Sequence, residues 1–279
     1  MDYSYWGLKE SPFRCGLDPK GFFPSGVHEE ALARLEFLVQ HGRRFGLLIG
    51  RAGTGKSLLL EVFSTKLRQA GRPTAQISAA GATGQELLWD MLVSLDRTPK
   101  PEARIAVLWR QLFDRFREAS LVGQPAVILW DQMESAHEEG WQTLTRLLGC
   151  ALRPQWAVTV VLSGRPELLR QLGAAVLDRV DLQMTLDPWE LSDTQRYLEE
   201  TLSRAGRNEP IFTPEATAHL HERSGGVPRR IALLADWALL AGAVQGATCI
   251  DPEIVEAVYQ ELSRSHPSVG DIYSLSPTL

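Results

Sequence analysis

The octapeptide GRAGTGKS, residues Gly50–Ser57, is the feature that most limits how this chain can fold. It fits the phosphate-binding pattern G-x-x-x-x-G-K-[ST], which functions only between a buried strand and the start of a helix. The apolar run Phe45–Ile49 precedes it directly, and a leucine-rich helical segment follows it. The motif therefore predicts a P-loop carried by an α/β sheet.

The chemistry of the motif gives each kind of residue in it a role. Glycines let backbone N–H groups curve around phosphate oxygens, and the start of the helix adds partial positive charge. Lys56 is expected to reach the β- and γ-phosphates, and Ser57 is expected to ligate Mg²⁺. The predicted ligands are thus ATP and Mg²⁺. The residues expected to contact the nucleotide here are Gly50, Arg51, Ala52, Gly53, Thr54, Gly55, Lys56, Ser57 and Leu58.

The segment AVILWDQ, Ala126–Gln132, is an apolar strand that ends in an acid and predicts the second half of the same site. Asp131 is expected to hold Mg²⁺ directly or through water. Gln132 stands where ATPases of this kind usually have Glu, which polarises the attacking water. An amide can hydrogen-bond water, but it cannot accept a proton at neutral pH. Glu134 is an alternative base, and the sequence leaves the choice open.

Short apolar runs alternate with helical patterns through the first two thirds of the chain. The predicted strands are Phe45–Ile49, Thr74–Ser78, Ala126–Trp130, Val158–Ser163 and Asp181–Leu186. Helix-length segments between them include Glu29–Gln40, Gly55–Ala70, Glu102–Ala119 and Pro166–Leu177. Unbroken apolar strands separated by amphipathic helices predict a parallel sheet covered on both faces, an αβα sandwich with five strands.

After about residue 190 the strand patterns stop and helix starts follow. Ser192 with Gln195 three residues later predicts a capping box. Thr213 and Asp251 each precede a proline, as a capping residue does, and a further helix is expected near Pro228. The predicted domains are a lead-in of residues 1–25, a nucleotide-binding αβα domain of residues 26–190, a helical lid of residues 191–264 and a mobile tail of residues 265–279.

Composition restricts the location and the partners of the protein. The formal net charge of −5 argues against non-specific coating of nucleic acid. Cys15, Cys150 and Cys249 are widely spaced, which predicts reduced thiols in the cytoplasm. The N-terminus lacks the pattern of a secretion signal. The most apolar stretch, Ile231–Val244, is too short to span a bilayer, so no direct membrane insertion is expected. The six histidines show no paired spacing, and no metal other than Mg²⁺ is predicted.

Several further segments carry a family resemblance together with the P-loop. They are WGLKESPF (Trp6–Phe13), DPKGFFPSGVHEEALARL (Asp18–Leu35), VLSGRPELLRQL (Val161–Leu172), DRVDLQMTLDPWELSDTQRYLEETLSRAG (Asp178–Gly206) and SGGVPRRIALLADWALLAGA (Ser224–Ala243). In these the chain resembles AAA+ ATPases of the group that includes ExeA-type general secretion ATPases and TnsC/TniB-type transposition regulators. It departs from that group at Gln132, at Arg165, where an uncharged polar residue is frequent, and in lacking a membrane or cell-wall-binding extension after the lid.

The resemblance implies three arginine roles. Arg165, or Ser163 before it, matches the sensor of the γ-phosphate at the end of the fourth strand. Arg179 matches the arginine finger that reaches the nucleotide of a neighbouring subunit, and Arg229 matches the sensor of the lid. Arg229 also has independent support. Arg229 and Arg230 stand in the first turn of a predicted helix, where the helix dipole disfavours cations. Two cations in this unfavourable position suggest that an anion nearby offsets the electrostatic cost.

Three functions stay open at this level. If Arg179 acts on the next subunit, the protein forms a homo-oligomer, as a ring or a filament. ATP would then drive self-assembly and the remodelling or recruitment of a secretion- or pilus-type complex whose protein partner the sequence does not identify. A DNA-binding transposition regulator is an alternative, which the acidic balance does not favour. The basic residues Arg104, Arg110, Arg115 and Arg117 are interleaved with acids, as on a solvated face. A slow or non-hydrolysing ATP-bound scaffold is the third possibility, because of Gln132.

Overall fold

The computed structural model describes residues 3–14, 16–151 and 156–265, and the chain divides into two compact units. The sheet unit is built by residues 17–187. The helical unit joins the N-terminal segment, up to Gly16, to the residues from Pro188 onward. The lead-in of residues 1–25 is thus shared between the two units. Cys15 and the predicted tail from residue 266 onward lie outside the described residues.

The sheet unit is organised around five parallel strands in the order β2-β3-β4-β1-β5. Its strands are β1 (Phe45–Gly50), β2 (Thr74–Ser78), β3 (Ala126–Asp131), β4 (Val158–Gly164) and β5 (Leu182–Leu186). Each predicted strand agrees with the observed bounds to within one residue. The prediction of a five-stranded parallel sheet is confirmed, because long apolar runs are the pattern of strands buried on both sides.

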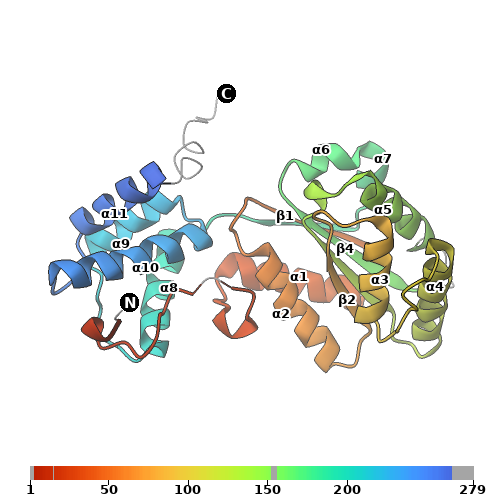
Figure 1. Ribbon diagram of the computed structural model, residues 1–279, viewed down its shortest axis with the longest axis horizontal. Helices are drawn as coiled ribbons and strands as arrows, with labels where there is room; N and C mark the ends of the chain where they lie inside the picture. The colour runs from red at the N-terminus through yellow and green to blue at the C-terminus, as the bar shows by residue number, and fades with distance from the viewer. Residues whose placement is uncertain (1–2, 15, 152–155, 266–279) are drawn as a thin grey trace. The chain divides into compact units, whose positions relative to one another are not determined.

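Helices cover both faces of this sheet (Figure 1). One face is covered by α1 (Gly26–Gln40) and α2 (Lys56–Gln69), and we call it the α2 face. The other is covered by α3 (Gly84–Ser94), α4 (Ile105–Leu121), α5 (Glu138–Ala151) and α6 (Leu168–Leu172), and we call it the α5 face. Successive side chains of a strand point to opposite faces. In β4, accordingly, Val161 packs in the core of the α2 face, whereas Val160 and Leu162 pack in that of the α5 face.

The predicted helix Pro166–Leu177 is wrong in one respect, because the structure interrupts it. The helix α6 ends at Leu172, and the short helix α7 (Ala174–Leu177) begins after Gly173. The backbone of Gly173 has φ +69°, which an α-helix, with φ near −63°, cannot contain. Glycine adopts such an angle without strain, so it ends the first segment.

The helical unit contains α8 (Leu191–Arg204), α9 (Pro214–Ser224), α10 (Pro228–Gln245) and α11 (Pro252–Ser265). Two predicted caps are confirmed: Thr213 Oγ1 accepts from Ala216 N at 3.1 Å, and Asp251 Oδ1 accepts from Ile254 N at 2.9 Å. The capping box predicted at Ser192 is wrong. The helix α8 already begins at Leu191 with Glu190 as its N-cap, so Ser192 lies inside the first turn.

A tryptophan anchors the N-terminal segment in the helical unit. The Trp6 side chain is 2% exposed, and its Nε1 donates to the Leu239 carbonyl of α10 at 2.8 Å. A Cβ atom on Gly242 would lie 2.9 Å from the Trp6 ring and 2.4 Å from Ile250. The missing side chain at residue 242 therefore makes room for the indole, and residues far apart in sequence share one core.

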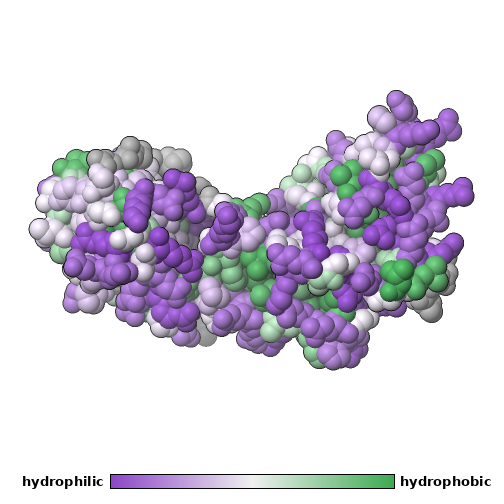
Figure 2. Space-filling model, turned by 90° about the horizontal axis from the view of Figure 1, so that it is seen from below, coloured by the Kyte–Doolittle hydropathy of each residue, from purple (hydrophilic) through white to green (hydrophobic). Residues whose placement is uncertain are grey.

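Polar side chains cover most of the molecular face in Figure 2, with apolar side chains gathered in smaller patches. Exposed apolar residues include Leu121 and Val244, each more than four-fifths exposed. None of the helices in the described part of the chain has the length and apolarity that a membrane span requires.

The packing of Trp6 predicts a large effect of its removal. Trp6→Ala should lower the free energy of unfolding by about 3–5 kcal/mol, the usual cost of truncating a buried aromatic side chain. Tyr5→Ala is the matched control, because this neighbouring ring is 47% exposed and should cost much less. Urea denaturation followed by far-ultraviolet circular dichroism measures both variants. Equal losses in the two would show that Trp6 does not anchor the segment.

Candidate nucleotide site

The P-loop joins β1 to α2, and its path depends on glycine at three positions. Gly53 and Gly55 have φ angles of +86° and +90°, in a region that side chains disfavour. A Cβ atom on Gly50 would lie 2.7 Å from Thr54 Oγ1 and 2.9 Å from the Leu186 carbonyl oxygen. The loop therefore folds back closely on itself, as a cradle for an anion must.

The start of α2 supplies positive charge to this cradle. The N-cap of α2 is Gly55, which has no side chain, so the N–H groups of the first turn lack a side-chain cap. Lys56 stands at the first helical position, and its Nζ donates to the carbonyls of Gly50 at 2.7 Å and Arg51 at 2.8 Å. The ammonium group thus lies over the loop, and ammonium and helix dipole together favour a polyphosphate.

Ser57 and Asp131 are brought together as the sequence analysis expected of two Mg²⁺ ligands. Ser57 Oγ donates to Asp131 Oδ2 at 2.5 Å, and the Asp131 side chain is buried at the end of β3. Asp131 Oδ1 accepts from the backbone N–H of Gln132 at 2.9 Å. A hydroxyl and a carboxylate are hard oxygen donors of the kind that Mg²⁺ prefers. The donor set therefore fits this ion beside the phosphate cradle.

Gln132 begins the turn that follows β3, and its backbone is in the left-handed region with φ +55° and ψ +39°. Few residues other than glycine adopt this conformation, and functional sites are enriched in such positions. The residue is exposed and adjoins Asp131. An exposed amide at the edge of the cradle can hydrogen-bond a water molecule, but it cannot take its proton.

Glu134, the alternative base, is held by a different set of neighbours. Its side chain is 11% exposed, and Oε1 lies 3.3 Å from Nε of Arg165. A Cβ atom on Gly164 would lie 2.7 Å from Glu134 Oε2 and 2.6 Å from Leu168, a core residue of the α5 face. The Glu134 carboxylate is therefore on the α5 side of β4. Asp131 alternates with Leu129 and so belongs to the α2 face.

Ser163 and Arg165 were both candidates for the γ-phosphate sensor, and the structure places them differently. Ser163 pairs with Leu48 of β1 and, by alternation with Val161, faces the α2 side. Its hydroxyl is fully buried and makes no hydrogen bond within the described residues. Arg165 is 54% exposed and paired with Glu134. Of the two, the serine hydroxyl is thus on the face that carries the P-loop.

Arg179 is exposed after α7, and its guanidinium makes no hydrogen bond or ion pair among the residues that the structure describes. Two residues later, Asp181 Oδ2 accepts from the backbone N–H groups of Arg44 and Phe45 at 2.9 and 3.0 Å, where β1 begins. The P-loop follows the opposite end of β1, and a strand of this length spans roughly 20 Å. Arg179 is thus at the sheet edge away from its own P-loop.

Arg229 lies exposed in the helical unit, in the first turn of α10. The N-cap of α10 is Val227, which gives no side-chain cap, and the first turn contains no acid. Its role as a lid sensor stays a prediction.

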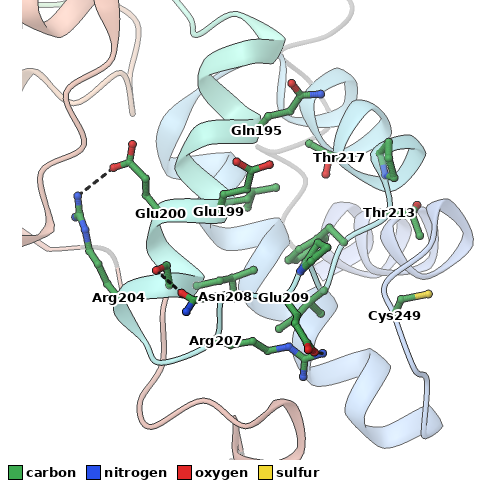
Figure 3. A pocket seen from close by; sticks show the side chains of 17 residues that line it. Gln195, Glu199, Glu200, Arg204, Arg207, Asn208, Glu209, Thr213, Thr217 and Cys249 are labelled. Atoms are coloured by element: carbon green, nitrogen blue, oxygen red, sulfur yellow. Dashed lines mark hydrogen bonds and ion pairs between the residues drawn. The ribbon is translucent and has the colours of Figure 1, made fainter.

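A pocket of about 890 Å³ lies within the helical unit (Figure 3). Its floor is formed by buried apolar side chains, which include Leu198, Leu202, Ile211 and Phe212. At its rim Arg204 pairs with Glu200 at 3.3 Å, and Ser203 donates to Asn208 at 2.7 Å. None of the residues that line it belongs to the P-loop.

His28 is a neighbour of the P-loop that belongs to the segment Asp18–Leu35 of the family resemblance, but the sequence predicted no role for it. It lies on α1, and its Nε2 is 2.9 Å from the Thr54 carbonyl oxygen. A signal was available in the spacing Ser25-x-x-His28. When Ser is the N-cap, the third helical position usually carries Glu or Gln, which completes a capping box. Histidine at that position suggests that the pair has another task.

Comparison with known proteins supports the family resemblance. Residues 39–172 match the family described as AAA domain. General secretion pathway protein A of Aeromonas hydrophila is 31% identical over 251 residues, which make up 88% of this chain and 46% of that protein. The chain contains an AAA domain. It spans less than half the length of that relative, and the family resemblance predicted from the sequence is confirmed.

Solved structures confirm the P-loop αβα fold. Cdc6p of Pyrobaculum aerophilum gives a TM-score of 0.68 at 18% identity, covering 88% of this chain and 71% of that one. ORC1 of Aeropyrum pernix, solved in complex with DNA, gives 0.67 at 16%, with coverages of 92% and 70%. The RuvB Holliday junction branch migration motor of Thermotoga maritima gives 0.59 at 17%, with coverages of 92% and 79%. Such low identities show the fold alone.

The position of Lys56 predicts that nucleotide affinity depends on its charge. Lys56→Ala should weaken ATP binding roughly 10- to 100-fold, because a hydrogen bond to a charged group contributes about 1.5–3 kcal/mol. Lys66→Ala on the same helix is the control, since Lys66 is exposed and pairs with Glu36. Isothermal titration calorimetry measures both. An unchanged affinity of Lys56→Ala would refute the assignment of the cradle.

Proposed function

We propose that this protein binds ATP with Mg²⁺ at the P-loop and uses the nucleotide to control its own assembly, with slow hydrolysis as the reset. The contact between Ser57 and Asp131 carries the proposal. It joins the first turn of α2 to the end of β3, so that two oxygen donors for Mg²⁺ adjoin a glycine-formed phosphate cradle. When bound, the ion would neutralise phosphate charge.

Different residues on the α2 face recognise different parts of the nucleotide. Lys56 and the first-turn N–H groups of α2 bind and orient the phosphates. Ser163 contributes a buried hydroxyl on the same face, and we assign it as the γ-phosphate sensor in preference to Arg165. A buried hydroxyl without a partner is costly, and a ligand oxygen would satisfy it.

Slow hydrolysis is expected from the positions of Gln132 and Glu134. Gln132 has no basic atom, and Glu134 is paired with Arg165 on the other side of β4. Orientation by the loop and electrostatic stabilisation do not depend on a base, so weak turnover should remain. This supports a switch that stays ATP-bound for long periods over a fast motor.

The position of Arg179 supports ATP-dependent self-assembly. An exposed guanidinium at the sheet edge away from its own P-loop cannot reach its own phosphates, yet it can meet those of a second copy in a head-to-tail arrangement. Such contacts close into rings or continue as filaments. Arg229 is the lid residue that we propose contacts the nucleotide.

The partner we propose is a secretion- or pilus-type assembly, on the strength of the 31% identity to general secretion pathway protein A. DNA binding is the alternative, because one of the similar folds, ORC1 of Aeropyrum pernix, was solved in complex with DNA. Two observations weigh against DNA. The net charge is −5, and Arg115, one of the four interleaved arginines, donates through Nε to the Leu95 carbonyl instead of facing outward.

The missing base predicts a gain of activity on its restoration. Gln132→Glu should raise kcat tenfold or more, which corresponds to about 1.4 kcal/mol of barrier, since a positioned base contributes roughly 10²–10⁴-fold. Glu134→Gln is the companion variant and should leave the slow wild-type rate nearly unchanged. Phosphate release under saturating ATP measures all three proteins. Brisk wild-type turnover that Glu134→Gln abolishes would make Glu134 the base and overturn the slow switch.

Arg179 predicts a separation of binding from assembly. Arg179→Ala should leave the ATP affinity of the monomer unchanged but abolish the ATP-dependent increase in particle size, because the guanidinium acts on a neighbouring copy. Arg170→Ala, an exposed arginine on α6, is the control. Light scattering with and without ATP is the measurement. ATP-driven oligomers that persist in Arg179→Ala would remove the finger assignment.

A further inference from the structure

The buried ring of His28 connects α1 to the P-loop. The side chain is 3% exposed, its Nδ1 lies 2.7 Å from Ser25 Oγ, and its Nε2 lies 2.9 Å from the Thr54 carbonyl oxygen. Phe22 packs edge-on against the ring, with centroids 5.8 Å apart. The imidazole therefore has polar contacts on both nitrogens and little freedom to turn.

The partners of the ring determine which nitrogen carries the proton. A carbonyl oxygen can only accept, so Nε2 must bear hydrogen and donate to Thr54. In a neutral ring Nδ1 is then an acceptor, and the Ser25 hydroxyl donates to it. Ser25 thus selects the tautomer that makes the contact with the P-loop possible.

Ser25 gives up its usual local role to make this contact. It is the N-cap of α1, yet its side chain makes no capping hydrogen bond to the helix backbone. A serine hydroxyl at this position ordinarily accepts from an N–H group of the first turn. Ser25 thus hydrogen-bonds the buried His28 ring in place of capping the helix. Exceptions of this kind to local stability are expected near functional sites.

The hydrogen bond to Thr54 also orients the amide of the next residue. The Thr54 carbonyl and the Gly55 N–H belong to one peptide group, and the described chain contains no cis peptide bond. In a trans peptide these two groups point in opposite directions. With the carbonyl held toward His28, the Gly55 N–H points away from the ring, at the N-cap of α2, where an anion is favoured.

Gly55 is also fitted to the ring by its lack of a side chain. A Cβ atom at this position would lie 2.7 Å from His28 Nε2. The ring can therefore approach the loop only because residue 55 is glycine, and the φ angle of +90° at Gly55 independently favours the same residue.

We propose that His28, with its tautomer set by Ser25, is a positioning residue of the nucleotide site: it fixes the Thr54–Gly55 peptide so that the Gly55 N–H faces the phosphates. The inference rests on the proposed function in that the ligand is a nucleoside polyphosphate. His28 acts through Gly55 and touches no phosphate itself.

Substitutions at residue 28 test this role directly. His28→Leu removes the donor and fills a similar space, and it should weaken ATP and ADP binding about tenfold or more. AMP affinity should change less, because AMP lacks the polyphosphate that the P-loop N–H groups surround. His28→Gln returns an N–H donor at about the reach of Nε2 and should recover affinity to within about threefold of wild type, a small free-energy difference. His41→Leu is the control, since His41 is exposed at the other end of α1.

A second readout does not require nucleotide. Amide hydrogen exchange of the peptide that covers residues 50–57 should be faster in His28→Leu than in wild type, because the loop loses its restraint. The rate should return toward wild type in His28→Gln. A purely structural role of His28 would alter the exchange of α1 and the melting temperature without a selective change in the loop, and that result would overturn the proposal.

The remaining outcomes distinguish the positioning role of His28 from the proposed function. ATP binding and loop exchange both unchanged in His28→Leu would overturn the positioning role. If wild type itself binds no ATP, the proposed function fails, and the exchange measurements still judge His28. Should His28→Leu not fold, Ser25→Ala takes its place. This change deletes only one hydroxyl, and it must weaken ATP binding and speed loop exchange, or the proposal is wrong.

Discussion

Parallel pairing of β3, β4 and β1 is the constraint on which every candidate residue of the sheet unit depends. Parallel strands end at one edge, so the P-loop after β1, Asp131 at the end of β3 and Ser163 near the end of β4 are gathered without any long loop. Because strand side chains alternate, the same pairing also decides which groups share a face. Chemistry at this site is thus a consequence of strand register.

The sequence was sufficient for the phosphate-binding motif and for the strands of the sheet. The P-loop is a contiguous motif, and the strands are unbroken apolar runs, so both were predictable. The positions of Glu134 and Ser163 were not, because the face that each side chain takes follows from register and from packing against Gly164 and Leu168. The cap of α8 was predicted wrongly because Glu190, which makes no side-chain capping hydrogen bond, is the N-cap in place of Ser192.

A nucleotide site with intact recognition and a weak base has a distinct physical character. In the proposed function, binding energy from Lys56, the helix dipole and the Mg²⁺ ligands would be available whether or not the γ-phosphate is cleaved. The lifetime of the bound state would then be set by hydrolysis at Gln132 and by release of the nucleotide. The fold does not by itself distinguish a slowly hydrolysing switch from a fast motor, because related folds carry different functions.

The docking of Trp6 against α10 has a consequence for how the chain is made. A ribosome releases the N-terminal segment first, but its binding partner, near Leu239 and Gly242, emerges only after the whole sheet unit. The sheet unit can therefore fold during synthesis while Trp6 is still exposed to solvent. The helical unit folds last, once both of its chain segments have been synthesised. Completion of the helical unit thus reports that translation has passed α10.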